Sequence, residues 1–227
     1  MSKKYIVANW KMNFNSKQVA IWIEEFKDLV SAGRPACVGR EDLEVILAPS
    51  FLHMEIVKKA GFSLAAQDVS LYDEGAHTGE TGAFQIKEYC KYCIIGHSER
   101  GETPSEILRK RDECLKNNIT PIVCFKSLEN TTGLYERGVL LAWEDPSSIS
   151  KDGIYRAKDI NEIRKDFNKV RNLLPKEAIV IYGGSVNSDN ISGLATLPGL
   201  DGVLVGHASL DPVQFVNLSK ALSDSHH

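Results

Sequence analysis

The stretches AIVIYGG (residues 178–184) and GVLVGHA (residues 202–208) decide the fold of this chain. Each is a short apolar run that ends in a turn containing glycine. Apolar runs without strict alternation of polar residues are typical of strands buried on both faces, as in parallel sheets. Six earlier runs of the same kind bring the number of predicted strands to eight: residues 5–10, 44–50, 63–69, 92–97, 121–125 and 139–144.

Helical patterns separate most of these runs. Ser16 is a suitable N-cap for a helix whose apolar residues, from Val19 to Val30, share one face. Helix starts are also predicted at Pro104 and at Asp211-Pro212, and apolar residues three and four apart predict a helix from Ile160 to Leu174. After the fifth strand, residues 127–138 leave room for at most a turn or two of helix.

Eight strands alternating with helices predict an α/β fold, and eight is the number of strands that closes a (β/α)8 barrel. We expect a single barrel domain over residues 1–227, with a reduced helix after strand five. The alternative is a doubly wound open sheet. Such a sheet more often carries a glycine-rich dinucleotide-binding turn after its first strand, where this chain has NWKMNFN (residues 9–15).

The composition excludes several classes of protein. The 227 residues are 43% hydrophobic and 25% charged with a formal net charge of −3, as in ordinary globular proteins. No apolar run reaches the roughly 18 residues of a membrane-spanning helix, and the start MSKKYIVANW predicts no signal peptide. The near-neutral charge gives no reason to expect nucleic acid or a membrane as partner.

The five cysteines indicate a reducing compartment, because their number is odd and no secretory signal accompanies them. Cys90 and Cys93 form an isolated CxxC pair without a second pair spaced for zinc. Since free cysteine usually behaves as a small buried residue, we interpret this pair as structural rather than metal-binding. We therefore expect a cytoplasmic protein.

Polar residues gather where the predicted strands end. In a (β/α)8 barrel the active site lies at the carboxyl ends of the strands, so these residues are expected on one rim. They are Asn9 and Lys11 after strand one, His97 and Glu99 after strand four, Glu144 after strand six, Ser185 after strand seven, and Gly206 and His207 after strand eight.

This set of residues suits one kind of chemistry. Glycine-rich turns let backbone N–H groups approach an anion, and their place after strands seven and eight matches the usual barrel phosphate site. A carboxylate base beside an imidazole can remove a proton next to a carbonyl through an enediolate. Each residue alone has an ordinary structural explanation, such as a solvated lysine or a tight turn. Their joint occurrence on one rim favours an active site for a small phosphorylated ligand.

Several longer motifs make the sequence recognisable. They are ANWKMN (8–13), APSF (48–51), AQDVS with GAHTGETGAF (66–84), IIGHSER (94–100), IVIYGGSV (179–186) and DGVLVGHASL (201–210). In this order, and over nearly the whole chain, they resemble the triosephosphate isomerase family. The resemblance implies a TIM barrel and an aldose–ketose isomerase of glycolysis and gluconeogenesis, which interconverts dihydroxyacetone phosphate and glyceraldehyde 3-phosphate without metal or cofactor.

The resemblance also implies roles for individual residues. Lys11 and Asn9 match the substrate-binding lysine and its neighbouring asparagine, His97 the electrophilic histidine, and Glu144 the base. Glu99 matches the acid that accompanies the lysine. The phosphate-binding residues implied are Ser150, Ser185, Gly206 and His207.

Two departures from the family pattern concern the lid over the active site. In the segment Asp145–Gly153 the base is followed directly by Asp145 instead of the usual proline, and the hinge tryptophan is missing from its usual place. Lys126-Ser127 replaces the usual Gly-Glu after strand five. Because both halves of one lid contact are changed together, we expect an altered lid and an isomerase of lower efficiency. By this resemblance, the chain is identified as a shortened member of the family.

The family generally forms homodimers in which a long third loop enters the neighbouring subunit. Here that loop is Leu71–Gly82, with Thr78 at the matching tip position, and we expect a homodimer. Two other functions stay open at this point. One is another phosphosugar isomerase or epimerase, and the other is a non-catalytic or impaired homologue that binds a phosphometabolite.

Overall fold

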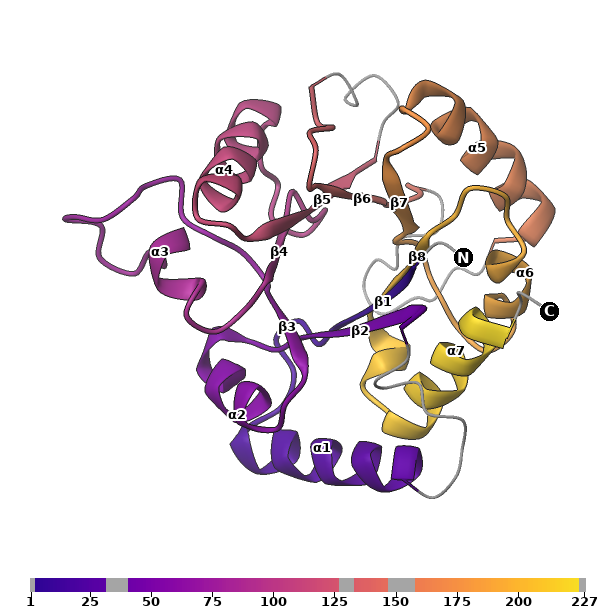
Figure 1. The fold of residues 1–227 in the computed structure, drawn as a ribbon, viewed down its shortest axis with the longest axis horizontal. Coiled ribbons are helices and arrows are strands. Elements are labelled where there is room, and N and C mark those ends of the chain that lie inside the picture. The colour runs from indigo at the N-terminus through magenta and orange to yellow at the C-terminus, as the bar shows by residue number, and fades with distance from the viewer. Residues whose placement is uncertain (1–2, 32–40, 127–132, 147–157, 225–227) are drawn as a thin grey trace.

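A computed structural model describes residues 3–31, 41–126, 133–146 and 158–224. Eight parallel strands form a closed barrel in chain order, and helices surround it (Figure 1). The strands are β1 (Lys4–Asn9), β2 (Leu43–Ala48), β3 (Ser63–Ala66), β4 (Tyr92–Ile95), β5 (Thr120–Phe125), β6 (Leu140–Trp143), β7 (Ile179–Tyr182) and β8 (Gly202–Val205). All eight predicted strands are confirmed, and the TIM barrel replaces the alternative of an open sheet.

The helices in the described part of the chain are α1 (Ser16–Ser31), α2 (Met54–Lys59), α3 (Ala83–Ile86), α4 (Pro104–Lys116), α5 (Ile160–Leu173), α6 (Ile191–Ala195) and α7 (Pro212–Asp224). Short 3-10 turns lie at Phe51–His53 and His207–Ser209. Between β5 and β6, the described residues 133–138 form turns and no helix, as the sequence predicts for this connection. None of the helices described has the length and apolar character needed to cross a membrane.

The barrel closes where the first strand meets the last. Tyr5 of β1 pairs with Gly202 of β8, and Ala8 pairs with Val205. At Gly202 the two backbones lie so close that a side-chain carbon would overlap the carbonyl of Tyr5, and only glycine fits there.

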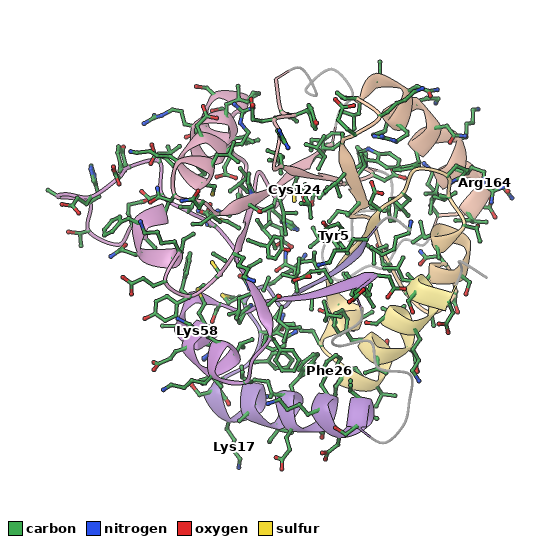
Figure 2. The ribbon with its side chains drawn as sticks, in the orientation of Figure 1. Tyr5, Lys17, Phe26, Lys58, Cys124 and Arg164 are labelled. Carbon is green, nitrogen blue, oxygen red and sulfur yellow. The ribbon has the colours of Figure 1, made fainter. Side chains whose placement is uncertain are left out.

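Alternation along the strands divides the apolar side chains into two sets. One set, which includes Val7, Ile94, Cys124 and Ala142, fills the barrel interior. The larger set lies between the barrel and the helices, where Phe26 of α1 is fully buried. Figure 2 shows Phe26 on the barrel side of α1 and Lys17 pointing away from it. The barrel is therefore a packed core, and only its ends are available for binding.

Side-chain caps fix the starts of the longer helices, α1, α4, α5 and α7. Asp211 accepts from the backbone N–H groups of Val213 and Gln214 at 2.8 and 3.0 Å, which confirms the predicted start of α7. The prediction of Ser16 as the cap of α1 is wrong by one residue. Asn15 is the cap because its Oδ1 accepts from the Gln18 N–H at 3.0 Å, while the Gln18 side chain accepts from the Asn15 N–H at 2.9 Å.

The described cysteines are free thiols in buried positions. Cys93 and Cys114 are fully buried, and burial raises the pKa of the Cys90 thiol to about 12. A thiol with so high a pKa is a poor metal ligand and a poor nucleophile at neutral pH. This supports the structural interpretation of the CxxC pair. Cys37 lies outside the described residues.

Candidate active site

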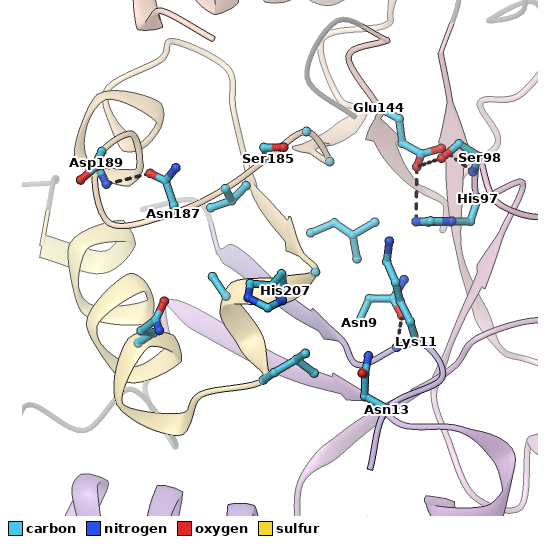
Figure 3. Close-up of a pocket in the computed structure, with 18 residues that line it drawn as sticks. Asn9, Lys11, Asn13, His97, Ser98, Glu144, Ser185, Asn187, Asp189 and His207 are labelled. Carbon is cyan, nitrogen blue, oxygen red and sulfur yellow. Dashed lines mark hydrogen bonds and ion pairs between the residues drawn. The ribbon is translucent and has the colours of Figure 1, made fainter. Parts of the chain in front are cut away.

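A cavity of about 440 Å³ opens at the carboxyl ends of the strands (Figure 3). This volume suits a small-molecule site. Residues that follow β1, β4, β6, β7 and β8 line it, and they include Asn9, Lys11, His97, Ser98, Glu144, Gly184, Ser185, Gly206 and His207. The barrel topology thus brings together side chains that lie nearly 200 residues apart in the sequence.

Lys11 follows β1 in an unusual backbone conformation. Its φ is 51°, in the left-handed region that non-glycine residues seldom adopt. Two neighbours hold it there. The Asn9 side chain accepts from the Lys11 N–H at 3.0 Å, and the Gln67 amide donates to the carbonyls of Lys11 and Ala48 at 2.9 and 2.8 Å. A strained backbone fixed by its surroundings is typical of a functional position.

The Lys11 side chain reaches across the mouth of the barrel. Its Nζ lies 2.5 Å from Glu99 Oε1, in an ion pair that is partly exposed to solvent. A side-chain carbon placed on Gly206 would lie 3.6 Å from Lys11 Cε, so the lysine passes close to the turn after β8. The ammonium group therefore lies between the side of the cavity lined by His97 and Glu144 and the side formed by the glycine-rich turns.

Glu144 is a buried carboxylate at the end of β6, with 2% of its surface exposed. The N–H of Ser98 donates to Oε2 at 2.8 Å and the Ser98 hydroxyl donates to Oε1 at 2.9 Å. Burial raises the pKa of Glu144 to about 7, although the hydrogen bonds from Ser98 act in the opposite direction. A carboxyl group with this pKa is a stronger base than an exposed one and suits proton transfer near neutral pH.

His97 stands beside Glu144, with 3.4 Å between its Nε2 and Glu144 Oε1. The backbone N–H of Glu99 donates to Nδ1 at 3.3 Å, which places the ring proton on Nε2. Burial lowers the pKa of His97 to about 4, and the positive charge of Lys11 lowers it further in the same direction. The ring is therefore neutral at pH 7 and presents an N–H donor toward the cavity.

The opposite wall of the cavity is formed by the turns after β7 and β8. The Asn190 side chain donates to the carbonyl of Ser185 at 2.7 Å and holds the first turn. A side-chain carbon on Gly184 would collide with the Tyr182 hydroxyl, so this turn requires glycine. Gly206 leads into the 3-10 turn His207–Ser209, and the His207 side chain is exposed. Such turns leave backbone N–H groups available to an anion.

The structure brings most of the predicted site residues together. Asn9, Lys11, His97, Glu144, Ser185, Gly206 and His207 line the one cavity, and Glu99 pairs with Lys11 at its edge. Ser150, and with it most of the predicted lid, lies outside the described residues. Among the described residues, no group of three His, Cys, Asp or Glu side chains is arranged to hold a metal ion.

The sequence did not reveal the partners that hold the reactive groups in place. Ser98 binds both oxygens of Glu144, and Gln67 binds the carbonyl of Lys11. Ser98 follows His97 directly in the HSER motif, and Gln67 belongs to the motif AQDVS. Their membership of these motifs was the only signal for them.

Fold and site together define a class of protein: a (β/α)8-barrel with a buried carboxyl group, a neutral imidazole and a lysine around a cavity of small-molecule size. The comparisons with known proteins identify the family. The family model described as Triosephosphate isomerase matches residues 4–222. The chain belongs to the triosephosphate isomerase family and is an enzyme, an isomerase.

Curated relatives cover nearly the whole chain. A triosephosphate isomerase of Mesomycoplasma hyopneumoniae is 34% identical over an alignment of 245 residues, with 94% of this chain and 97% of the relative covered. The triosephosphate isomerase of Thermodesulfovibrio yellowstonii is 30% identical, with 97% and 100% covered. That of Francisella tularensis subsp. mediasiatica is 30% identical, with 94% of each chain covered.

Proposed function

We propose that this chain carries out the isomerisation of its family at the cavity described above, with Glu144 as base, His97 as electrophile and Lys11 as the substrate-binding cation. The substrates are dihydroxyacetone phosphate and glyceraldehyde 3-phosphate. The observation that carries the assignment is the contact of a buried carboxylate with a neutral imidazole, 3.4 Å apart, on a cavity wall opposite glycine-rich turns.

The proposed proton path follows from these groups. The Glu144 carboxylate accepts a proton from the carbon next to the substrate carbonyl, and the electron pair of that C–H bond moves to form an enediolate. The Nε2–H of His97 donates a hydrogen bond to the developing oxyanion, and the Lys11 ammonium stabilises the same charge. His97 gives its Nε2 proton to the former carbonyl oxygen and takes up the hydroxyl proton of the neighbouring oxygen, while Glu144 returns its proton to the neighbouring carbon. The carbonyl has then moved by one carbon, both side chains are restored, and no net oxidation or reduction has occurred.

The glycine-rich wall is the proposed place of the substrate phosphate. Ser185, Gly206 and His207 bound this wall, and Lys11 Cε lies close to Gly206. Successive backbone N–H groups in such turns form concavities that bind anions, and a nearby cation adds to the attraction for phosphate. Ser150 is proposed as a further contact from the lid. Asn9 supports Lys11 through the hydrogen bond to its N–H.

A coupled assay tests the proposal. Purified protein is given glyceraldehyde 3-phosphate, and dihydroxyacetone phosphate is reduced by an auxiliary dehydrogenase, so that isomerisation is followed continuously. We expect turnover that saturates with substrate and is unchanged by a chelator. Absence of turnover with retained phosphate-ligand binding would favour the non-catalytic homologue. Turnover of only a pentose phosphate would favour an epimerase.

The rate should depend on pH through Glu144. Because its pKa is about 7 rather than 4.5, we expect kcat/KM to fall below about pH 7 as the base becomes protonated, and to level off above it. The Ser98→Ala variant loses one hydrogen bond that favours the carboxylate, so its midpoint should move to higher pH. The substrate phosphate also titrates, near pH 6, but identically with both proteins. A midpoint near 4.5, or one that Ser98→Ala leaves in place, would contradict the assignment.

We also propose a homodimer formed through the Leu71–Gly82 loop, with Thr78 at its tip. This loop extends away from the barrel in Figure 1. Met12 follows β1 and Leu52 follows β2, so both lie at the end of the barrel from which this loop leaves after β3, and they are 97% and 86% exposed. The proposed partner surface covers them.

Sedimentation velocity at micromolar concentration tests the dimer. We expect about twice the monomer mass of 25.2 kDa. Leu52→Glu should release monomers because it places a charge in the contact, whereas Leu173→Glu, at an exposed leucine of α5, should not. A monomer mass for the unmodified chain would refute the dimer.

Location and pathway complete the proposal. We place the enzyme in the cytoplasm, as a step of glycolysis and gluconeogenesis, and treat residues 1–227 as one barrel domain. The support is the membership of the family, the composition and the net charge of −3, which offers no electrostatic attraction to nucleic acid or to anionic membranes.

A further inference from the structure

A chain of ion pairs begins at the residue that follows the proposed base. Lys158 Nζ donates to Asp145 Oδ2 at 3.0 Å and to Asp166 Oδ2 at 2.7 Å. Asp145 directly follows Glu144, and Asp166 lies on α5. A single lysine thus joins the end of β6 to the helix that precedes β7. We use "the Lys158 bridge" for these three residues.

The bridge is built of groups that are costly to bury. The side chains of Asp145 and Lys158 are only 4% and 13% exposed. A buried carboxylate is tolerated when it is paired and hydrogen-bonded, and removing its partner leaves an uncompensated charge. Replacing such a pair with apolar residues is often neutral for stability, so stability alone does not account for charges at this position.

The far end of the bridge is held firmly. Asp159, which follows Lys158, caps α5 by accepting from the Asn161 N–H at 2.8 Å. Paired with Lys158 and Lys169, Asp166 has its pKa lowered to about 2, so it carries its charge throughout the neutral range. Lys158 is therefore fixed to α5 by its bond to Asp166 and by the cap at the neighbouring Asp159. Through Lys158, the side chain of Asp145 is linked to this helix.

The backbone at Glu144 is also held by hydrogen bonds to the two neighbouring strand segments. On its N-terminal side, its own N–H donates to the Phe125 carbonyl at 2.9 Å, and the Trp143 carbonyl accepts from the Gly183 N–H at 2.8 Å. Strand β6 ends at Trp143, so these bonds lie at the carboxyl end of its ladder. The Lys158 bridge adds a contact on the C-terminal side, because Lys158 binds the side chain of Asp145, the next residue.

We propose that Asp145, Lys158 and Asp166 act as positioning residues that fix the backbone at Glu144, so that its carboxylate is presented to the substrate carbon at the distance that proton transfer needs. The proposal rests on the assignment of Glu144 as base. Ser98 holds both carboxylate oxygens. With the backbone also fixed on both sides, any movement of the carboxylate toward the substrate carbon is a rotation about the side-chain bonds alone. Misplacement of a reacting group by about 1 Å can cost on the order of 100-fold in rate.

The test compares two lysines that share one partner. Lys169 Nζ also lies 2.7 Å from Asp166, but Lys169 is exposed and has no contact with Asp145 among the interactions described. We expect Lys158→Met to lower kcat by about 10- to 100-fold, with KM changed less than about threefold, whereas Lys169→Met leaves both unchanged. Substrate deuterated at the transferred position should show a larger isotope effect on kcat with Lys158→Met, because proton transfer has become the slower step.

A charge-preserving change provides the second arm. Lys158→Arg keeps a cation that can reach both carboxylates and should recover most of the lost kcat, while Asp145→Asn should resemble Lys158→Met. Thermal unfolding of each variant shows whether it is folded. If Lys158→Met is unstable, then Asp145→Asn and Lys158→Arg still give the comparison.

The outcomes separate this inference from the assignment beneath it. If Lys158→Met and Asp145→Asn fold and retain kcat and the isotope effect of the unmodified enzyme, the bridge is only structural and the inference fails. If Glu144→Gln leaves the rate unchanged, the assignment of the base fails, whatever the bridge variants do. A loss of kcat that Lys158→Arg restores supports the inference.

Discussion

Replacing Glu144 with Gln lowers kcat by about three to four orders of magnitude, the range expected for loss of a positioned general base. The amide keeps the shape of the side chain and can still accept from Ser98, but it cannot take a proton from carbon. Its fold should be intact, because the carboxylate is already disfavoured by burial, as its raised pKa of about 7 indicates. Steady-state kinetics in both directions, together with thermal unfolding, measure the two effects separately.

Two further variants sharpen this result. Glu144→Asp keeps the charge but withdraws it by one methylene, so kcat should still fall by about 100-fold or more. Glu25→Gln, at an exposed position of α1, makes the same chemical change away from the cavity and should have no effect. An unchanged rate in Glu144→Gln would exclude this residue as the base.

Replacing Lys11 with Met lowers kcat/KM by about 100- to 1,000-fold, the loss typical of a preorganised electrostatic group. The ammonium lies between the side of the cavity formed by His97 and Glu144 and the turn after β8. In the proposed mechanism it therefore acts on both the phosphate and the developing enediolate. We therefore expect KM to rise and kcat to fall. Methionine is an unbranched side chain of similar length, and it meets the same left-handed backbone conformation as lysine at this position. The substitution therefore measures the effect of the positive charge.

The inhibition constant of a phosphoglycolate-type enediolate mimic is the second measurement for Lys11. We expect it to rise with Lys11→Met in parallel with the loss of kcat/KM, because such a mimic carries both charges that the lysine contacts. Lys11→Arg keeps the charge and should lose less. Removing Lys11 leaves Glu99 without its ion pair, but Glu99 is 56% exposed and stays solvated. Unaltered saturation by substrate would contradict the role of Lys11.

The fold was predictable because its signal is local and repeated. Eight apolar runs with polar ends give the strands, and the spacing of apolar residues gives the long helices. Such local signals can place a helix start to the exact residue, because Asp211 is both the predicted and the observed cap of α7. The cap of α1 was misplaced because Asn15 and Ser16 are both good caps, and only the reciprocal bonds with Gln18 distinguish them.

The candidate site was predictable in its reactive groups but not in what holds them. Lys11, His97 and Glu144 follow predicted strands, so the barrel topology alone places them on one rim. The bonds of Ser98 to Glu144, of Gln67 to Lys11 and of Lys158 to Asp145 join elements whose distance depends on packing. Sequence spacing carries no information about such contacts. The predicted contact of Ser150 stays a prediction.

The pairing of β1 with β8 closes the barrel, so closure requires both the first and the last strand. We call this pairing the seam. Tyr5 meets Gly202 across almost 200 residues, and joining ends so far apart carries the largest loop-closure cost in the sheet. Lys11 and Gly206 stand on opposite sides of that seam, so during synthesis the binding site does not exist until the last strand has left the ribosome. If the proposed phosphate site is correct, a ligand bound to both β1 and β8 stabilises the closed barrel by mass action over any form in which the two strands have separated.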